Sequence, residues 1–391
     1  MELNSDVIYL LRKEFLRLHG QNNKMVIVRS PGRINLIGEH TDYNEGFVLP
    51  SAIDRAIYLA VAPGHDFEVT ITSLDFNDNF SFDSRKPAKS EKIWANYLIG
   101  VVGELRKAGY PVNGFNCVYA GDVPIGAGMS SSAAVESGLA LALNTIFGLG
   151  ISRVELARIA QRSENEFVGV KCGIMDQFAN LLSKGESALY LDCRSLGYEY
   201  IPFLRKDLKF VLCDTGVKHS LASSEYNLRR QQCEAGVRIM NEYIPGTRSL
   251  RDITSQMLQE HEKELGDTVY KRCMYVVEEN ARVGAARKSL QRNDYASVGE
   301  LLYISHQGLR DKYEVSCKEL DVLVDGASKI EGVLGARMMG GGFGGCTLNL
   351  VERDAVGDFK RRIQETYLEK TGKVPQLYEC VLMPGTDVVT D

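Results

Sequence analysis

The stretch PIGAGMSSSAA at residues 124–134 places the tightest limit on the fold of this 391-residue chain. Its glycines and serines follow a strand-like segment, FNCVYAGD (115–122), and run directly into a helix-forming segment, AAVESGLALALNTIF (133–147). A loop that opens a helix presents free backbone N–H groups and the positive end of the helix dipole, so it favours a bound anion such as a phosphate. An ordinary serine cap would give a similar pattern. The G-K-[ST] ending of a P-loop is missing, which disfavours a P-loop NTPase.

Around this loop the chain mixes strand-like and helix-like segments without strict alternation, which favours an α+β fold over a doubly wound sheet. Helical spacing of apolar residues predicts an N-terminal amphipathic helix that packs on the core. Its inward residues would be Val7, Ile8, Leu11, Phe15 and Leu18. The other predicted elements are strands at 25–33, 56–64, 67–74, 208–216 and 377–384, helices at 93–110, 152–168 (capped by Ser152) and 354–370, a helical region at about 224–315, a strand–glycine loop–strand unit at 333–351 and a polar excursion at 77–92.

The length of the chain favours two domains. We expect an N-terminal domain at 1–205 and a C-terminal domain at 206–391, with the last strand or helix free to pack back on the first domain. No internal repeat or low-complexity linker is visible in the sequence.

Composition excludes several classes of function. The net charge is −5 and no basic tract is present, which argues against nucleic acid as a partner. No apolar run approaches the ~20 residues that span a bilayer, and the N-terminus lacks the pattern of a signal peptide. The nine cysteines include no C-x-x-C pair, so we expect reduced thiols in a cytoplasmic protein.

The segment GRINLIGEHTDYN, residues 32–44, packs hydrogen-bonding side chains into thirteen positions between and beyond two glycines. A cluster of directional polar groups this dense is hard to explain as ordinary surface.

A third glycine-rich segment is MMGGGFGGCTLNL. Gly340, Gly342 and Gly345 satisfy G-x-G-x-x-G formally, but a strand-like CTLNLV follows, whereas the dinucleotide-binding motif must open a helix. We therefore discount the dinucleotide reading. Five glycines in six positions still indicate backbone contact with a ligand or with another backbone, and a tight hairpin is the alternative.

One carboxylate, Asp176, lies in GVKCGIMDQFAN just after Gly173. A lone aspartate of this kind is usually a helix cap or a turn former. It becomes a candidate general base only with a cation nearby and a proton to accept, and Arg33 and a sugar or alcohol hydroxyl would supply these.

These motifs, in this order, resemble the GHMP small-molecule kinases, and GRINLIGEHTDYN resembles the signature of the galactokinase family. PIGAGMSSSAA, GGGFGGCT and CGIMDQF match further family motifs, with Gly341 where alanine is also common, and WANYLIGV and CDTGVKHS also fit the pattern. The resemblance extends over nearly the whole chain. It implies an N-terminal domain that binds the sugar and ATP and is like ribosomal protein S5 domain 2, a ferredoxin-like C-terminal domain, an active site between them, and a monomer.

The resemblance also implies an explicit site. Asp176 would take the proton of the anomeric hydroxyl of galactose, and Arg33 would stabilise the aspartate and counter the charge on the transferring phosphoryl group. The implied sugar-binding residues are Arg33, Glu39, His40, Thr41, Asp42, Gly173, Asp176 and Tyr226. The implied nucleotide-binding residues are Ser73, Trp94, Gly126, Ala127, Gly128, Met129, Ser130, Ser131 and Ser132, although Trp94 fits an ordinary core position equally well. Ser132 and Glu164 would hold the Mg²⁺ that accompanies ATP.

The implied activity is the ATP- and Mg²⁺-dependent phosphorylation of galactose to galactose 1-phosphate, the first step of galactose catabolism in the Leloir pathway. One alternative is a GHMP kinase for another sugar, such as N-acetylgalactosamine or arabinose, but the intact GEHTDY favours galactose. The other alternative is a catalytically silent galactose sensor. Relatives of that kind lack a Ser-Ala pair in the second motif, and here Ser132-Ala133-Ala134 is complete.

Overall fold

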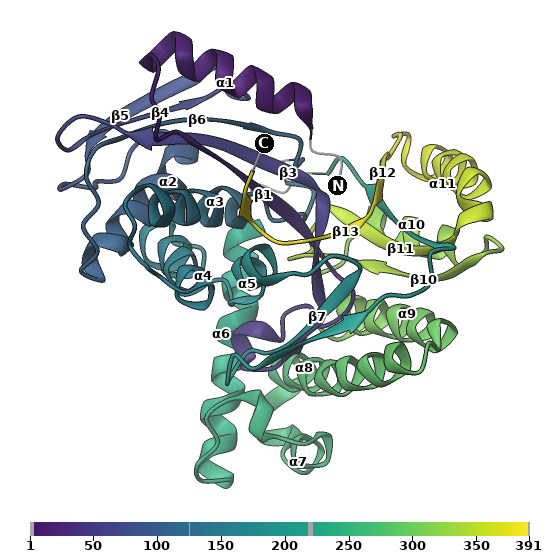
Figure 1. Cartoon of the computed structure of the whole chain (residues 1–391). Helices are drawn as coiled ribbons and strands as arrows, with labels where there is room; N and C mark the ends of the chain where they lie inside the picture. Colours follow the sequence, from purple (N-terminus) through teal and green to yellow (C-terminus); the bar gives the residue numbers. More distant parts are fainter. Residues whose placement is uncertain (1–3, 125, 218–221, 390–391) are drawn as a thin grey trace.

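The computed structural model describes residues 4–124, 126–217 and 222–389 (Figure 1). Ile125 of the second motif and residues 218–220 of CDTGVKHS lie outside the described residues. Helices and strands are mixed, and the sheets are built mainly from antiparallel pairs, as the α+β expectation requires. Among the described helices, none combines the length and the apolarity needed to cross a membrane.

The first sheet carries the N-terminal half of the molecule. In the described residues its strands run in the order β14-β1-β3-β6-β4-β5, with β13 paired to β3. β4 pairs with β6 in parallel, and the other pairs are antiparallel. The strands are β1 (Val26–Asn35), β3 (Pro50–Pro63), β4 (Glu68–Ser73), β5 (Asp78–Asp83), β6 (Phe115–Gly121), β13 (Leu382–Met383) and β14 (Asp387–Val388).

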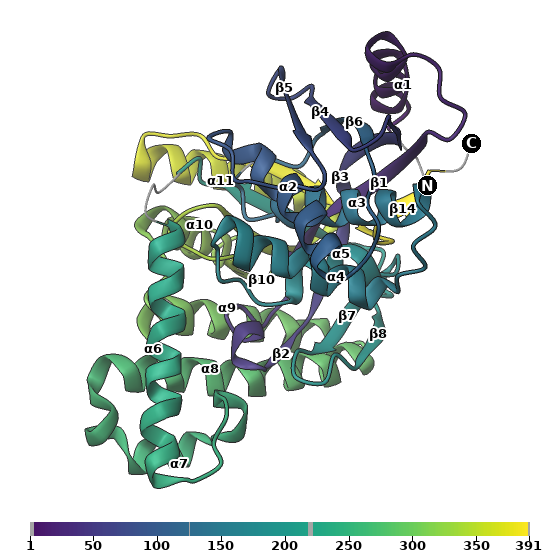
Figure 2. The ribbon, with the colours of Figure 1, turned by 90° about the vertical axis from the view of Figure 1, so that its left-hand side faces the viewer.

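Helices cover both faces of this sheet (Figures 1 and 2). α1 (Ser5–His19) packs on one face through Leu11 and Phe15, next to the alternate residues Tyr58 and Ala60 of β3. On the other face lie α2 (Ile93–Lys107), α3 (Ser131–Ile146), α4 (Arg153–Arg162), the π-helical turn η2 (Ser163–Val168) and α5 (Met175–Leu182). β1 and β3 are therefore buried along most of their length.

A second sheet of four antiparallel strands has the order β10-β11-β9-β12. Its strands are β9 (Leu208–Asp214), β10 (Val333–Met338), β11 (Cys346–Glu352) and β12 (Gln376–Cys380). α10 (Lys318–Ala327) and α11 (Val356–Thr371) cover one face with their own apolar cluster. The other face joins the main core together with α9 (Tyr295–Asp311).

Smaller elements complete the described structure. A third sheet joins β2 (Phe47–Val48), β7 (Ser187–Asp192) and β8 (Tyr198–Pro202). α6 (Ala222–Tyr243), α7 (Ser255–Glu260) and α8 (Glu262–Gln291) form a helical extension with a separate apolar cluster (Figure 2). Single-turn 3₁₀ segments lie at η1 (Asp42–Asn44), η3 (Leu250–Asp252) and η4 (Arg353–Ala355). At the end of the chain, β13 and β14 return to the first sheet, where they pair with β3 and β1.

The structure departs from the sequence-based expectations at four places. Leu18 is 39 % exposed although it lies on the same side of α1 as Leu11, because it is in the last turn of the helix, beyond the residues that pack on the sheet. The polar excursion contains β5, which pairs with β4 at the edge of the sheet, where polar side chains face water. The helix expected at 152–168 begins at its Ser152 cap but continues as a π-helix after Arg162. The closing strand is divided between β12 and β13, which belong to different sheets.

Candidate active site

The three glycine-containing motifs meet around one cavity of about 470 Å³. The turn after β1, the loop that leads into α3, and residues 339–345 between β10 and β11 form most of its walls. The predicted site residues that line the cavity are Arg33, Glu39, His40, Asp42, Asp176, Tyr226, Gly126, Gly128, Met129, Ser130, Ser131, Ser132 and Glu164. Segments far apart in the sequence therefore share one concave, polar site.

Arg33 and Asp176 form a two-pronged ion pair in this cavity. Nε of Arg33 donates to Oδ1 of Asp176 and Nη2 donates to Oδ2, each over 2.8 Å. The remaining Nη1 donates to the carbonyl of Gly128 in the loop before α3. The Arg33 side chain is 5 % exposed and that of Asp176 is 23 % exposed. The arginine is thus a fixed, buried support for a carboxylate that still faces the cavity.

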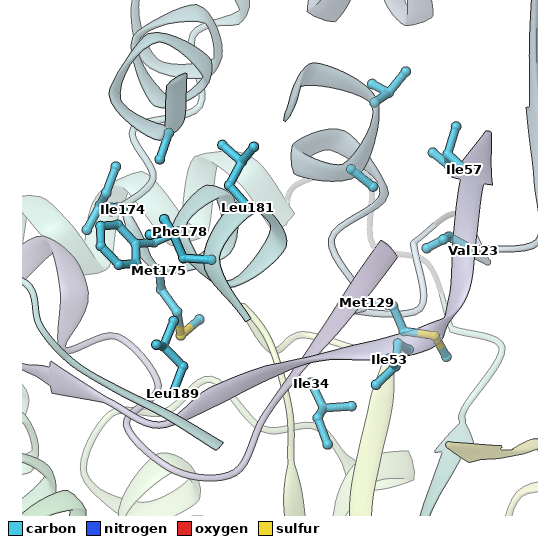
Figure 3. Packing of buried hydrophobic residues seen from close by; sticks show 14 of the residues in the cluster. Ile34, Ile53, Ile57, Val123, Met129, Ile174, Met175, Phe178, Leu181 and Leu189 are labelled. Atoms are coloured by element: carbon cyan, nitrogen blue, oxygen red, sulfur yellow. The ribbon is translucent and has the colours of Figure 1, made fainter. Parts of the chain in front are cut away.

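Packing explains why this pair is well placed. Arg33 follows a bulge in the pairing of β1 with β3, and the next residue, Ile34, enters the main core. Asp176 lies in the first turn of α5, where the helix dipole favours a negative charge. Its neighbours Met175 and Phe178 belong to the same apolar cluster as Ile34 (Figure 3). Both members of the pair are therefore anchored by buried residues on either side.

Ser130 links the loop before α3 to the same carboxylate. The residue adopts a left-handed conformation, with φ 60° and ψ 53°, which non-glycine residues adopt only when their surroundings hold them there. Its hydroxyl donates to Oδ2 of Asp176 rather than capping α3. The first turn of α3 thus receives no hydrogen bond from its N-cap side chain, and Ser131 and Ser132 face the cavity beside it. Such a helix terminus is suited to an anion.

Buried carboxyl groups lie behind Asp176. Ser132 and Gln177 both hydrogen-bond to Glu164, the latter from Nε2 over 2.7 Å. Burial raises the pKa of Glu164 to about 7, and the charge of Asp176 adds to the rise. Burial, together with Glu164, also raises the pKa of the fully buried Glu136 well above its usual range. A divalent cation would relieve this shortage of positive charge, so the residues fit Mg²⁺.

Glu39 is held from three sides. Oε1 accepts hydrogen bonds from Nη2 of Arg337 over 2.8 Å and from the backbone N–H of Gly340 over 2.9 Å. Oε2 accepts one from Asn35 Nδ2 over 2.9 Å. Burial by itself would raise the pKa of Glu39, but Arg337, Arg33 and the Gly340 N–H outweigh it and lower the pKa. Glu39 is therefore an ionised acceptor in the cavity wall.

His40 and Asp42 stand beside Glu39. His40 Nδ1 and the hydroxyl of Tyr43 share a hydrogen bond of 2.8 Å, and burial lowers the pKa of His40 to about 4, so the imidazole is neutral at pH 7. Burial raises the pKa of Asp42 to about 7, with a further contribution from Asp176. Gly173 lies directly behind Asp42, because a Cβ at that position would be 2.1 Å from the carboxyl carbon. This glycine makes room for the Asp42 side chain.

Thr41, Gly173 and Ala127, which are carried over from the resemblance, do not line this cavity. The Thr41 hydroxyl donates within its own turn, to the carbonyls of Gly38 and Phe47, over 2.8 and 2.6 Å. Ala127 is buried in the main apolar cluster. In this structure Thr41 shapes the turn that presents Glu39 and its neighbours.

The second and third glycine loops touch each other backbone to backbone. A Cβ on Gly340 would lie 3.3 Å from Cα of Gly128, and Gly128 has φ 72°. Tyr226 of α6 lies beside the third loop, where a Cβ on Gly341 would be 3.3 Å from its ring. β11 follows the loop, so the G-x-G-x-x-G match opens a strand and not a helix. The glycines thus allow three walls of the cavity to close together.

Ser73 and Trp94 lie outside the lining of the cavity, in a neighbouring aromatic patch. The Trp94 ring stacks on Phe76 at a centroid distance of 6.1 Å, and its Nε1 donates to Asp78 over 3.1 Å. Tyr119 contacts Trp94 and hydrogen-bonds to Ser73. The two predicted residues are therefore brought together by the structure.

Sequence reasoning missed Tyr97 and Arg337. Tyr97 lines the cavity one helical turn after Trp94, so it connects the cavity to the aromatic patch. The spacing in WANY holds this signal, since residues three apart share a face of a helix. Arg337 gave no signal, because an arginine inside a strand is normally a surface residue.

Comparison with known proteins places these features in a family. Three family models match the chain: the GHMP kinases N terminal domain at residues 96–184, the galactokinase galactose-binding signature at 13–63 and the GHMP kinases C terminal at 286–369. A galactokinase of Roseiflexus sp. (strain RS-1) is 43% identical over 381 residues, which is 97% of each chain. The chain belongs to the galactokinase family. A galactokinase of Thermotoga maritima is 42% identical over 88% of this chain and 95% of its own length.

Solved structures agree with this assignment. The crystal structure of Lactococcus lactis galactokinase complexed with galactose superposes with a TM-score of 0.94 at 34% identity, covering 98% of this chain and all of that one. Methanococcus jannaschii mevalonate kinase, at 17% identity, shares the fold with a TM-score of 0.64 over 93% of this chain and 100% of that one. The α+β fold of the GHMP kinases, expected from the motifs, is confirmed.

Proposed function

We propose that this galactokinase-family protein transfers the terminal phosphoryl group of ATP to the anomeric hydroxyl of galactose, giving galactose 1-phosphate and ADP. The position of Asp176 is the observation that carries the proposal. Its carboxylate stands between the polar turn after β1 and the N-terminus of α3, where a hydroxyl-rich ligand and a phosphate would meet. The galactose complex of the similar Lactococcus lactis enzyme supports the same substrate.

The sugar would lie against Glu39, His40, Asp42 and Tyr226. An ionised Glu39 and the carboxyl of Asp42 accept hydrogen bonds from hydroxyls, and the neutral His40 contributes a ring nitrogen. Several fixed partners around one hexose allow epimers to be distinguished, because a misplaced hydroxyl leaves a buried group unpaired.

In the proposed reaction, the anomeric oxygen of the sugar attacks the γ-phosphorus of ATP while Asp176 accepts the proton of that hydroxyl. ADP leaves with the electrons of the broken P–O bond. Arg33 holds the carboxylate in place through both of its oxygens and offsets negative charge at the reaction centre. Phosphoryl transfer depends mainly on such positioning and charge neutralisation, so no covalent intermediate is needed.

The nucleotide phosphates would occupy the loop at 126–132 and the open first turn of α3. From there the adenine would extend past Tyr97 to the patch of Trp94 and Ser73. Ser132 and Glu164 would hold Mg²⁺ together with phosphate oxygens and water. The metal ion would neutralise phosphate charge. Among the residues that the structure describes, no three His, Cys, Asp or Glu side chains form a metal site by themselves.

Three further parts of the proposal concern organisation. We propose a division into domains at 1–205 and 206–391 with the cavity between them. This division is supported by the cavity lining, which includes residues from both parts of the chain. We also propose a monomer. A cytoplasmic location is supported by the nine free cysteines, since reduced thiols are typical there.

ADP release with Mg²⁺-ATP across galactose, glucose, N-acetylgalactosamine, arabinose and mevalonate tests the proposal. We expect turnover with galactose far above the rest. Turnover with another sugar would agree with the proposed mechanism but would contradict the proposed substrate. No turnover, with galactose still bound by calorimetry, would favour the sensor.

A further inference from the structure

Arg337 is a fully buried arginine at the end of β10, directly before the third glycine loop. Its exposure is 0%. Nε donates to the carbonyl of Leu36 over 2.7 Å, Nη2 to that of Asn35 over 2.6 Å, and Nη1 to that of Met338 over 2.9 Å. Two of these carbonyls lie where β1 ends and the polar turn begins. Arg337 therefore ties the second sheet to the segment that carries Glu39.

The same guanidinium also fixes the Glu39 side chain. Nη2 of Arg337 and the N–H of Gly340 fill the two acceptor positions of Oε1, at 2.8 and 2.9 Å. Oε2 receives a single bond, from Asn35. A carboxylate oxygen has two lone-pair sites, so one site on Oε2 remains for a ligand.

We propose that Arg337 is a positioning residue for sugar recognition, which orients Glu39 so that Oε2 accepts one particular hydroxyl of the sugar. Arg337 has no place of its own in the cavity lining and acts through Glu39 and the backbone at 35–36. The inference rests on the proposed function, because it assumes that a sugar occupies the cavity.

The geometry requires an arginine. A planar guanidinium reaches four acceptors in fixed directions, whereas a lysine ammonium is a single point charge with three donors. Arg337→Lys would keep the charge beside Glu39 but release some of the backbone carbonyls and let the carboxylate turn. Sugar recognition should weaken while the fold keeps its buried charge pair.

Arg29 offers a matched control. It is also buried, at 5 % exposure, and its Nη2 donates to the carbonyls of Ile53 and Asp54 over 2.8 and 3.2 Å. Nη1 donates to the carbonyl of Pro384, and Arg29 does not line the cavity. Arg29→Lys thus perturbs a comparable set of hydrogen bonds to backbone carbonyls, but outside the cavity lining.

The experiment measures kcat and KM for galactose, for each monodeoxygalactose and for ATP in four proteins: wild type, Glu39→Gln, Arg337→Lys and Arg29→Lys. Glu39→Gln identifies the hydroxyl that binds Oε2. The variant should stop distinguishing galactose from the one monodeoxygalactose that lacks this hydroxyl. We expect Arg337→Lys to lose discrimination against that same deoxy sugar by about tenfold, with the KM for ATP nearly unchanged. Arg29→Lys should keep the wild-type pattern.

The inference would be overturned if Arg337→Lys lost kcat/KM equally for every sugar and for ATP. It would also be overturned if the variant distinguished the sugars as the wild type does. If Arg337→Lys does not fold, Glu39→Gln/Arg337→Met replaces it, because no buried charge is then left unpaired. That double variant must raise the KM for galactose above the value for Glu39→Gln alone; an equal KM would also overturn the inference. A wild type that does not phosphorylate galactose would instead contradict the proposed function.

Discussion

Gly173 and Asp42 lie so close together that a single methyl group does not fit between them. A Cβ at Gly173 would be 2.1 Å from both the carboxyl carbon and Oδ2 of Asp42. The two residues come from different motifs, the turn after β1 and the loop before α5, and Asp42 lines the cavity while Gly173 lies behind it.

Gly173→Ala should therefore push the Asp42 carboxyl out of place. We expect the KM for galactose to rise by about tenfold or more, since a buried polar partner is lost, while the KM for ATP changes little. Steady-state kinetics with each substrate varied in turn provides the check. Gly357→Ala is the control, because a Cβ there meets nothing within 4 Å and the residue lies in the helix α11. A KM for galactose unchanged in Gly173→Ala would mean that Asp42 does not contact the sugar.

Asp176→Asn should keep binding and lose turnover. The amide keeps the shape of the side chain and one acceptor for Arg33, but it does not take up the proton. We expect kcat to fall by about 10²–10⁴-fold, the range typical of a lost general base. Calorimetry with galactose and with an ATP analogue measures the retained affinity. Near-wild-type turnover would show that another group is the base.

Asp42 should make the stability of the ligand-free protein depend on pH. Its pKa is raised from 3.8 to about 7, so its contribution to stability is complete below about pH 4 and is lost as the pH rises to 7. Asparagine does not titrate, so Asp42→Asn does not lose this stability as the pH rises. We expect the free energy of unfolding of the variant, relative to wild type, to improve by about 2–3 kcal/mol between pH 5 and pH 8. Urea unfolding at both pH values measures it, and a constant difference would contradict the raised pKa.

Two positions on the same side of α1 should respond differently to the same truncation. Leu11 is fully buried between the helix and the first sheet, so Leu11→Ala should cost about 2–4 kcal/mol in the free energy of unfolding. Leu18 is 39 % exposed, and Leu18→Ala should change it by less than about 0.5 kcal/mol. Equal losses in denaturant unfolding would show that Leu18 is also packed.

Trp94 should matter to the nucleotide and not to the sugar. If adenine lies on the patch formed with Phe76, Trp94→Ala should raise the KM for ATP several-fold and leave the KM for galactose nearly unchanged. Trp94→Phe, which keeps an aromatic surface, serves as the matched variant and should lie close to wild type. Equal effects on both substrates would point to a purely structural tryptophan.

The sequence by itself determined most of the local structure and the identity of the family. Periodicity located α2 and α11, and a run of helix-forming residues located α3. Ser152 marked the start of α4, and the loop before α3 indicated an open helix terminus. These signals depend on neighbouring residues only. Motif order pointed to the family that the comparisons establish. Local patterns did not predict elements that depend on long-range pairing. The polar strand β5 is one of these, because it forms by pairing with the edge of β4.

Only the tertiary structure decided how the motifs work together. Whether Asp176 was a helix cap or a partner of Arg33 depended on a contact between β1 and α5, and the sequence left both readings open. Arg337 gave no signal in the sequence, and only the packing of β10 places its guanidinium beside Glu39. Such contacts join residues that are distant in the chain, so they follow from how the sheets and helices pack and not from the order of the residues.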